Sequence, residues 1–214
     1  MILERLQSLL GDIYDVEPPL DVASFLVTDP AVASRWADEG SATDEALFVR
    51  ETDDGLDLAL FVDAAVLERL ESADPFASLG EENLQDCCTA LEGVSHLLYL
   101  AWSAMQGRSV SLLELETQAE VDKFAATLVL SGARPGAEVT ELHDRLFERV
   151  RFAAGLDRER LDRYQAANRF AARFCHRLAR RWLHAPRPGH HGLFGELRSF
   201  YRMPHARKIA HARR

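Results

Sequence analysis

After Asp74-Pro75 the chain reads as a succession of helical segments, and this feature most constrains its fold. Glycine or proline follows each long segment closely, as is typical of helix ends. Four segments are long, with predicted ranges of 81–106, 111–131, 137–153 and 157–183. A short helix over 193–202 precedes a basic tail. Long amphipathic helices joined by short connections pack as a bundle.

The clearest β signal lies upstream of these helices. Residues 46–51 and 56–62 are rich in apolar and β-branched side chains and flank Asp54-Gly55, a turn-forming pair. Residues 22–27 offer a further strand, and Asp63 is suited to cap a helix over 64–71. We therefore expect a mainly α fold, with a helical bundle of about four long helices preceded by a small α+β N-terminal element with a β-hairpin. The regions would be 1–75 and 76–214, or one compact domain.

The chain shows no features of an exported or membrane-spanning protein. Its first residues include Glu4 where a signal peptide needs positive charge, and no apolar run approaches about 18 residues. Cys87, Cys88 and Cys175 are an odd number of cysteines without a metal-binding spacing. These observations predict a cytoplasmic protein, not associated with membranes, whose three thiols are reduced and mostly buried.

Charge is distributed very unevenly along the sequence. The net charge is −9, but residues 1–150 carry a formal −21 and residues 151–214 a formal +12. The chain has 23 arginines and 2 lysines, which we attribute to a GC-rich coding background. The position of the positive charge is therefore informative, whereas its arginine identity is not.

Much of this positive charge follows one helical face. On the predicted 157–183 helix, arginines recur at intervals of three or four residues, which places them on one side. The predicted binding residues are Arg169, Arg173, Arg177, Arg180, Arg181 and Arg202. The pattern indicates a non-catalytic binding or regulatory module that contacts an acidic protein surface or other polyanion, and a solvated helix face is the alternative.

The partner expected for this face is an acidic protein surface, including that of a second copy in a dimer. The acidic N-terminal region would repel phosphate at long range, which disfavours nucleic acid. Nucleic acid stays possible, but the sequence contains no zinc-finger or aromatic RNA-binding motif to support it.

A second interpretation rests on the predicted 81–106 helix, which is apolar around most of its circumference. Glu92 and His96 lie in its narrow polar strip with i, i+4 spacing, so the carboxylate could orient the imidazole or share a metal ion with it. His143 and Glu120 lie on the neighbouring predicted helices. If they converge, Glu92, His96, His143 and Glu120 would form the catalytic site of an enzyme or ligand-binding protein, with Glu92, His96 and His143 as metal ligands. The alternative is a thin solvent strip and a hydrogen-bonded core histidine. The sequence favours no particular cofactor.

Overall fold

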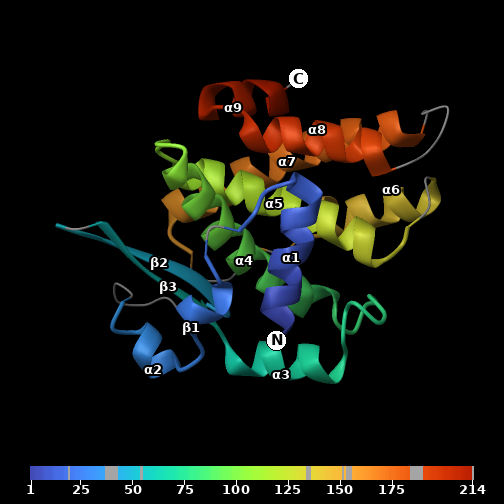
Figure 1. The fold of residues 1–214 in the computed structure, drawn as a ribbon. Helices are drawn as coiled ribbons and strands as arrows, with labels where there is room; N and C mark the ends of the chain where they lie inside the picture. The colour runs from blue at the N-terminus through green and yellow to red at the C-terminus, as the bar shows by residue number, and fades with distance from the viewer. Residues whose placement is uncertain are drawn as a thin grey trace.

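Helices dominate the chain, and three of them are long (Figure 1). They are α4 (Leu84–Met105), α5 (Leu112–Leu130) and α7 (Arg158–Leu183). The structure is a computed structural model that describes residues 1–18, 20–36, 43–53, 55–133, 136–150, 152, 156–183 and 190–213. The predicted mainly helical class, with a small sheet, is confirmed.

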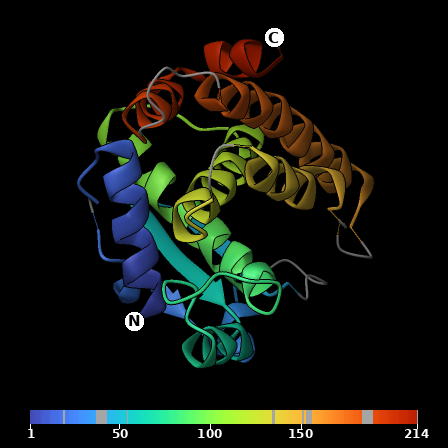
Figure 2. The same cartoon turned by 90° about the vertical axis from the view of Figure 1, so that its right-hand side faces the viewer.

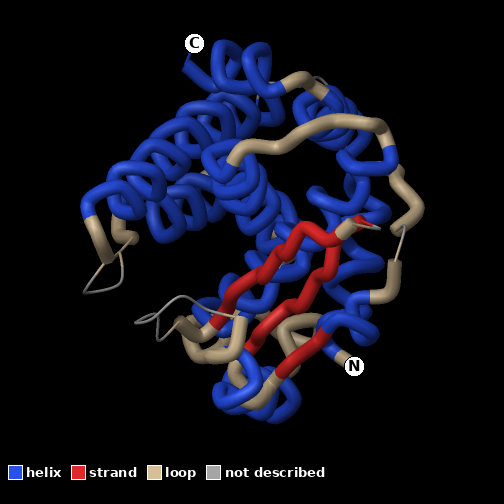
Figure 3. Tube along the Cα trace, turned by 90° about the vertical axis from the view of Figure 1, so that its left-hand side faces the viewer, coloured by secondary structure: helices blue, strands red, loops and turns tan. Residues whose placement is uncertain are grey.

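The sheet contains β1 (Leu26–Val27), β2 (Glu45–Thr52) and β3 (Gly55–Val62) in the order β1-β3-β2. β2 runs antiparallel to β3, with Glu45 opposite Val62 and Thr52 opposite Gly55, and β1 runs parallel to β3. Figure 3 shows the strands on one side of the molecule, with helices behind them. Both β2 and β3 contact α4. This register brings Glu45, at the start of β2, against the central helix.

The remaining elements surround the long helices. Before α4 come α1 (Ile2–Tyr14), the 3-10 helix η1 (Val22–Phe25), α2 (Pro30–Ala33) and α3 (Ala64–Ser72). After α5 come α6 (Ala137–His143), the π-helical turn η2 (Asp144–Glu148), α8 (His190–Arg202) and α9 (His205–Arg213). Figure 2 shows α1 and α7 on either side of the central helices. No described helix is long and apolar enough to cross a bilayer.

Local side-chain bonds explain where the boundaries differ from the predicted ones. The Asp21 carboxylate accepts a hydrogen bond from the Ala23 amide, so residues 22–25 turn into a 3-10 helix instead of continuing a strand. Asn83 bonds to Gly80, Ala73 and Ser78 and holds residues 78–83 in a turn, which delays the start of α4. The helix predicted over 137–153 is α-helical only to His143, and residues 151 and 153–155 lie outside the described chain.

One apolar core joins the N-terminal and C-terminal parts of the chain. α1 contributes residues with almost no exposed surface, and it contacts α4, α5 and α8. The same core cluster contains side chains of β3, α7 and α8. The three cysteines are unpaired and buried, as expected from the sequence. The boundary at residue 75 stays a prediction.

A buried polar network holds α9 in place. The Lys208 side chain is fully buried, and its Nζ donates to Tyr99 Oη and Gln118 Oε1, both at 2.7 Å. Gln118 in turn donates to Asp122, 2.6 Å away. Burial lowers the pKa of Lys208 to about 7, and burial raises the pKa of Asp122 to about 6. A buried ammonium is costly even with Glu114 Oε1 4.0 Å away, so the folded protein favours the neutral amine more than the unfolded chain does.

We predict that Lys208 makes stability depend on pH in the alkaline range. Between pH 7 and about 10.5 the unfolded chain binds a proton at Lys208 that the folded protein has released, so the unfolding free energy rises with pH. Relative to Lys208→Met, the wild type should gain a few kcal/mol over this interval, since one pKa unit corresponds to about 1.4 kcal/mol. Urea unfolding at a series of pH values measures this difference. Arg207→Met, at an exposed position of the same helix, is the control and should follow the wild type. Parallel curves for wild type and Lys208→Met would contradict the prediction.

Candidate metal and ligand site

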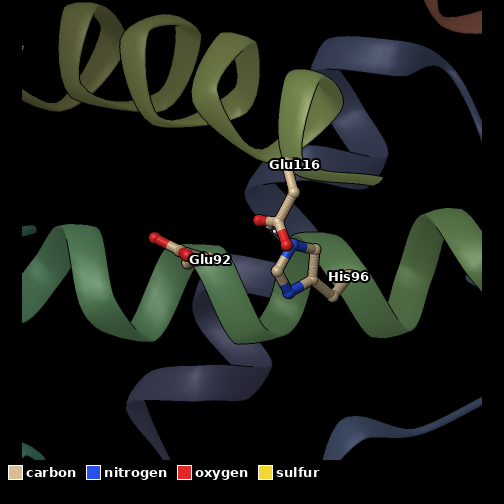
Figure 4. A group of neighbouring side chains, drawn as sticks. All are labelled: Glu92, His96 and Glu116. Carbon is tan, nitrogen blue, oxygen red and sulfur yellow. Dashed lines mark ion pairs between the residues drawn. The ribbon is translucent and has the colours of Figure 1, made fainter. Parts of the chain in front are cut away.

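A carboxylate and histidine cluster lies between α4 and α5 (Figure 4). Glu92 and His96 project from α4, and Glu116 projects from α5 toward the imidazole. One ligand atom from each of these three residues lies within 4.8 Å of the other two. His96 Nε2 is 3.4 Å from Glu116 Oε2. The pair predicted from i, i+4 spacing is therefore joined by a carboxylate from the neighbouring helix.

Glu45 reaches the other side of the imidazole. Its Oε1 atom is 3.5 Å from His96 Nδ1. Gly93 makes this approach possible, because a Cβ atom there would lie 2.9 Å from Glu45 Cγ and 2.8 Å from Leu60 Cδ1. The missing side chain on α4 thus lets the start of β2 pack directly over the cluster. Glu45 is 51 positions from His96 along the chain, and no spacing in the sequence links the two.

The cluster is buried, yet several of its polar atoms have no hydrogen-bond partner. His96 and Glu116 are each 8% exposed. Glu45 Oε1 and His96 Nε2 lack a hydrogen bond of ordinary geometry, and so does Arg163 Nε, 3.7 Å from Glu116 Oε1. Buried polar groups without partners are rare in native proteins. The Glu45 and His96 atoms therefore have only the longer ion-pair contacts of 3.5 Å and 3.4 Å with their neighbours.

Lys123 extends the cluster toward Glu120. Its Nζ atom lies 2.9 Å from Glu92 Oε2 and 2.8 Å from Glu120 Oε1. Burial lowers the pKa of Lys123, but Glu120 and Glu92 outweigh burial and hold the pKa well above its usual value. Burial raises the pKa of Glu92, but Lys123 and His96 outweigh it, so the net pKa of Glu92 is lowered. Glu92 is therefore an anion shared between an ammonium and the histidine cluster.

The protonation of His96 is governed by its two carboxylate neighbours. Burial lowers the pKa of His96, but the contacts with Glu116 and Glu45 outweigh it and hold the pKa well above its usual value. Burial raises the pKa of Glu45, and His96 only partly offsets this. The imidazole is thus an imidazolium that compensates buried negative charge.

A pocket of about 600 Å³ adjoins this cluster. Its polar lining includes Glu45, Glu92, Glu120 and Lys123, which also belong to the ion-paired network. An apolar part of its lining comes from the segment that leads into α7 and from α7 itself: Leu146, Val150, Phe152, Leu156 and Tyr164. A small molecule with an apolar body and a polar end could reach the cluster through this pocket.

His143, the other histidine predicted for this site, lies elsewhere. Its Nε2 atom is 3.0 Å from the Ala172 carbonyl oxygen, and its ring packs against Phe124 and Phe147. This is the arrangement of the hydrogen-bonded core histidine that the sequence left as an alternative. Glu120, by contrast, belongs to the network through Lys123.

The predicted arginines divide into two groups. Arg177 donates to the His211 carbonyl at 2.7 Å, Arg202 donates to the Asp15 carbonyl at 2.9 Å, and Arg181 forms an ion pair with Glu196. Arginines at carbonyl ends of helices interact favourably with the helix dipole. The remaining three are exposed and form no ion pair with a described residue: Arg169, Arg173 and Arg180.

Comparisons with protein-family models, with curated proteins and with solved structures find no match to this chain. The geometry of the site is therefore the basis for a proposed function.

We predict that His96 and Glu45 are energetically coupled in the metal-free protein. At pH 6 the His96→Gln change removes the imidazolium and leaves two buried carboxylates with less positive charge, which should lower the unfolding free energy by about 3 kcal/mol. Adding Glu45→Gln should recover part of this loss, because it removes one of the uncompensated charges. Urea unfolding in the presence of a chelator measures the cycle. The cycle of His143→Gln with Glu45→Gln should be additive, and additivity in the His96 cycle would contradict the coupling.

Proposed function

We propose that the protein binds one divalent transition-metal ion through Glu92, His96 and Glu116, and that this ion acts on a small molecule held in the adjoining pocket. The protein would then be a metal-dependent enzyme or a ligand-binding protein. The observation that carries the proposal is the convergence of the buried His96 imidazole, the buried Glu116 carboxylate and the partly exposed Glu92 carboxylate beside a pocket, with one ligand atom of each within 4.8 Å of the other two.

The donor set and its spacing fit such an ion. One imidazole and two carboxylates suit Zn²⁺, Mn²⁺ or Fe²⁺ better than Ca²⁺ or Mg²⁺, which prefer oxygen ligands only. Two ligand atoms bound at about 2.0 Å to one tetrahedral ion lie about 3.3 Å apart. His96 Nε2 and Glu116 Oε2 are 3.4 Å apart, so this pair needs almost no rearrangement. Glu92 would have to move closer by a side-chain rotation.

Glu45 supports this assignment of the imidazole nitrogens. In protein metal sites the second ring nitrogen of a ligating histidine usually donates to a carboxylate or carbonyl, which fixes the ring. His96 has this arrangement, with Nε2 facing Glu116 and Nδ1 facing Glu45. Glu45 would therefore orient the ligand without binding the ion.

The charge of the cluster also favours a divalent ion. Its four carboxylates are Glu45, Glu92, Glu116 and Glu120. They face Lys123, Arg163 and the His96 imidazolium, which leaves one negative charge in excess. If a divalent ion replaces the proton on His96, the positive and negative charges of the cluster become equal in number. Binding would thus remove an uncompensated buried charge at the cost of one proton.

The pocket would supply the substrate or ligand. Three protein ligands leave coordination positions open, as in catalytic rather than structural metal sites. When bound, a divalent ion polarises a carbonyl or phosphoryl oxygen and lowers the pKa of a bound water. The polar end of the molecule would lie on the Glu92 side of the pocket, whereas Leu146 and Phe152 would contact its apolar part.

We predict that the purified protein carries one metal ion per chain. Expression with added Zn²⁺ or Mn²⁺, gel filtration and elemental analysis measure the stoichiometry. His96→Gln should abolish stoichiometric binding because it removes the nitrogen ligand, and Glu45→Gln should weaken binding by about 10- to 100-fold. His143→Gln changes a histidine outside the cluster and should keep the ion. Equal metal content in His96→Gln and wild type would overturn the proposal.

A second candidate function rests on the three exposed arginines of α7. Arg169, Arg173 and Arg180 form no ion pair with a described residue, whereas other arginines of the basic region are used within the fold. We propose this smaller face, in place of the full set predicted from sequence, as a contact for an acidic protein surface or a second copy of the chain. Such a contact would be compatible with a metal site elsewhere in the molecule.

We predict that Arg169→Glu/Arg173→Glu lowers the salt concentration needed to elute the protein from a phosphate-bearing resin. Arg158→Glu/Arg160→Glu is the matched control, because it makes the same charge change on the same helix where each arginine already has an acidic neighbour. Sedimentation at low and high salt tests self-association of the same variants. Equal elution shifts for the two pairs would show that only net charge matters.

A further inference from the structure

We infer that Lys123 is a built-in cation that occupies the place of a second metal ion and restricts the cluster to one. This inference rests on the proposed metal site and concerns what the cluster would otherwise bind. It assigns Lys123 as a residue that determines metal stoichiometry.

The position of the ammonium carries the inference. Lys123 Nζ lies between Glu92 Oε2 and Glu120 Oε1, at 2.9 and 2.8 Å, and its side chain is 12% exposed. Glu92 belongs at the same time to the three-ligand cluster with His96 and Glu116. One carboxylate therefore faces both the proposed ion and the ammonium. In two-metal sites the two ions are typically about 3.5–4 Å apart, and a carboxylate that binds both ions has this role.

The cluster contains enough donors for a second ion. Glu120 takes no part in the three-ligand group, and burial raises its pKa, only partly offset by Lys123. Glu45 Oε1 is buried without a hydrogen-bond partner. With Lys123 removed, Glu92 and Glu120 would lose their shared counter-charge and would face each other beside the pocket as partly buried carboxylates. A divalent ion is the species that would best compensate them.

The use of lysine at this position supports the inference independently. The chain has 2 lysines among 25 basic residues, and both lie beside carboxylates, with the Lys208 side chain fully buried and that of Lys123 12% exposed. An ammonium is a compact point charge with three donors, whereas a guanidinium is a broad planar fork. Only the ammonium can lie between two carboxylates in the way that a metal ion does.

A nucleophilic role does not fit the same geometry. A lysine nucleophile must lose its proton, whereas two carboxylates at 2.9 and 2.8 Å from Lys123 Nζ favour the protonated ammonium. Lys123 also keeps both ion pairs within the network, so its charge is already used. A permanent cation is the role that the contacts support.

The test compares metal stoichiometry in the full-length wild type, Lys123→Gln and Lys123→Met. Each metal-free protein is titrated with Mn²⁺, the bound ions are counted by elemental analysis, and electron paramagnetic resonance detects spin-coupled pairs. Arg145→Gln is the matched control, because Arg145 lines the same pocket but forms its ion pairs with Glu81 and Glu141. The change therefore removes a positive charge without removing a partner of Glu92 or Glu120. Circular dichroism establishes that each variant is folded.

We expect one ion in wild type and Arg145→Gln, and two spin-coupled ions in at least one folded Lys123 variant. One ion in every folded Lys123 variant would overturn the inference and leave the proposed metal site intact. A spin-coupled pair in the wild type would also overturn it. No ion in wild type but binding in a Lys123 variant would overturn the proposed function while supporting the role of Lys123. No ion in any protein would overturn both.

Discussion

The packing of α4 against α5 is the contact on which the rest of the structure depends, because it buries ionisable groups on both sides of one apolar seam. On α5, Glu120 and Lys123 line the pocket, and Glu116 contacts His96. The intervening polar residues of the same helix bond into a second network: Glu114, Gln118 and Asp122. On α4, His96 contacts Glu116 of the first group, and Ser95 donates a hydrogen bond to Asp122 of the second network. Burying so many charges is tolerable only if each receives a partner.

Those partners come from distant parts of the chain, and this explains how the outer elements are positioned. β2 supplies Glu45, α7 supplies Arg163 and α9 supplies Lys208. Each of these elements also packs apolar side chains, but non-directional contacts alone would tolerate a shift along α4 and α5. A charged group that must meet a specific carboxylate or imidazole does not tolerate such a shift. Electrostatic compensation therefore fixes the register of elements that the hydrophobic core holds together.

Because these partners come from distant parts of the chain, the sequence predicts the local elements but not the full set of residues in the cluster. Helices and strands follow from local periodicity and turn residues, and the pairing of Glu92 with His96 follows from helical spacing. Glu116 and Glu45 join them only through tertiary packing, and the room that Gly93 leaves for Glu45 has no local signature. His143 has the periodicity of a core-facing residue, which fits a site ligand and a core histidine equally well. For a related reason, the sequence does not distinguish Arg177 and Arg202, which donate to carbonyl oxygens at the ends of other helices, from arginines without such contacts.

Ion pairs such as Arg163 with Glu116 and Lys208 with Glu114 join the acidic and basic parts of the chain. Comparing the two buried networks to which they belong indicates where chemistry is expected. Around Lys208 the ammonium is enclosed, and the nearby carboxylates receive hydrogen bonds from tyrosine, serine and glutamine side chains. Around His96 the contacts are longer, Glu45 Oε1 and His96 Nε2 lack hydrogen bonds of ordinary geometry, and Glu92 opens on a pocket. A network that serves stability alone gains by satisfying every group. Buried atoms without hydrogen bonds occur in both networks, but those around His96 lie beside the pocket. This is why we propose a site for an exchangeable ligand at His96 and its neighbours, and an anchoring role for Lys208.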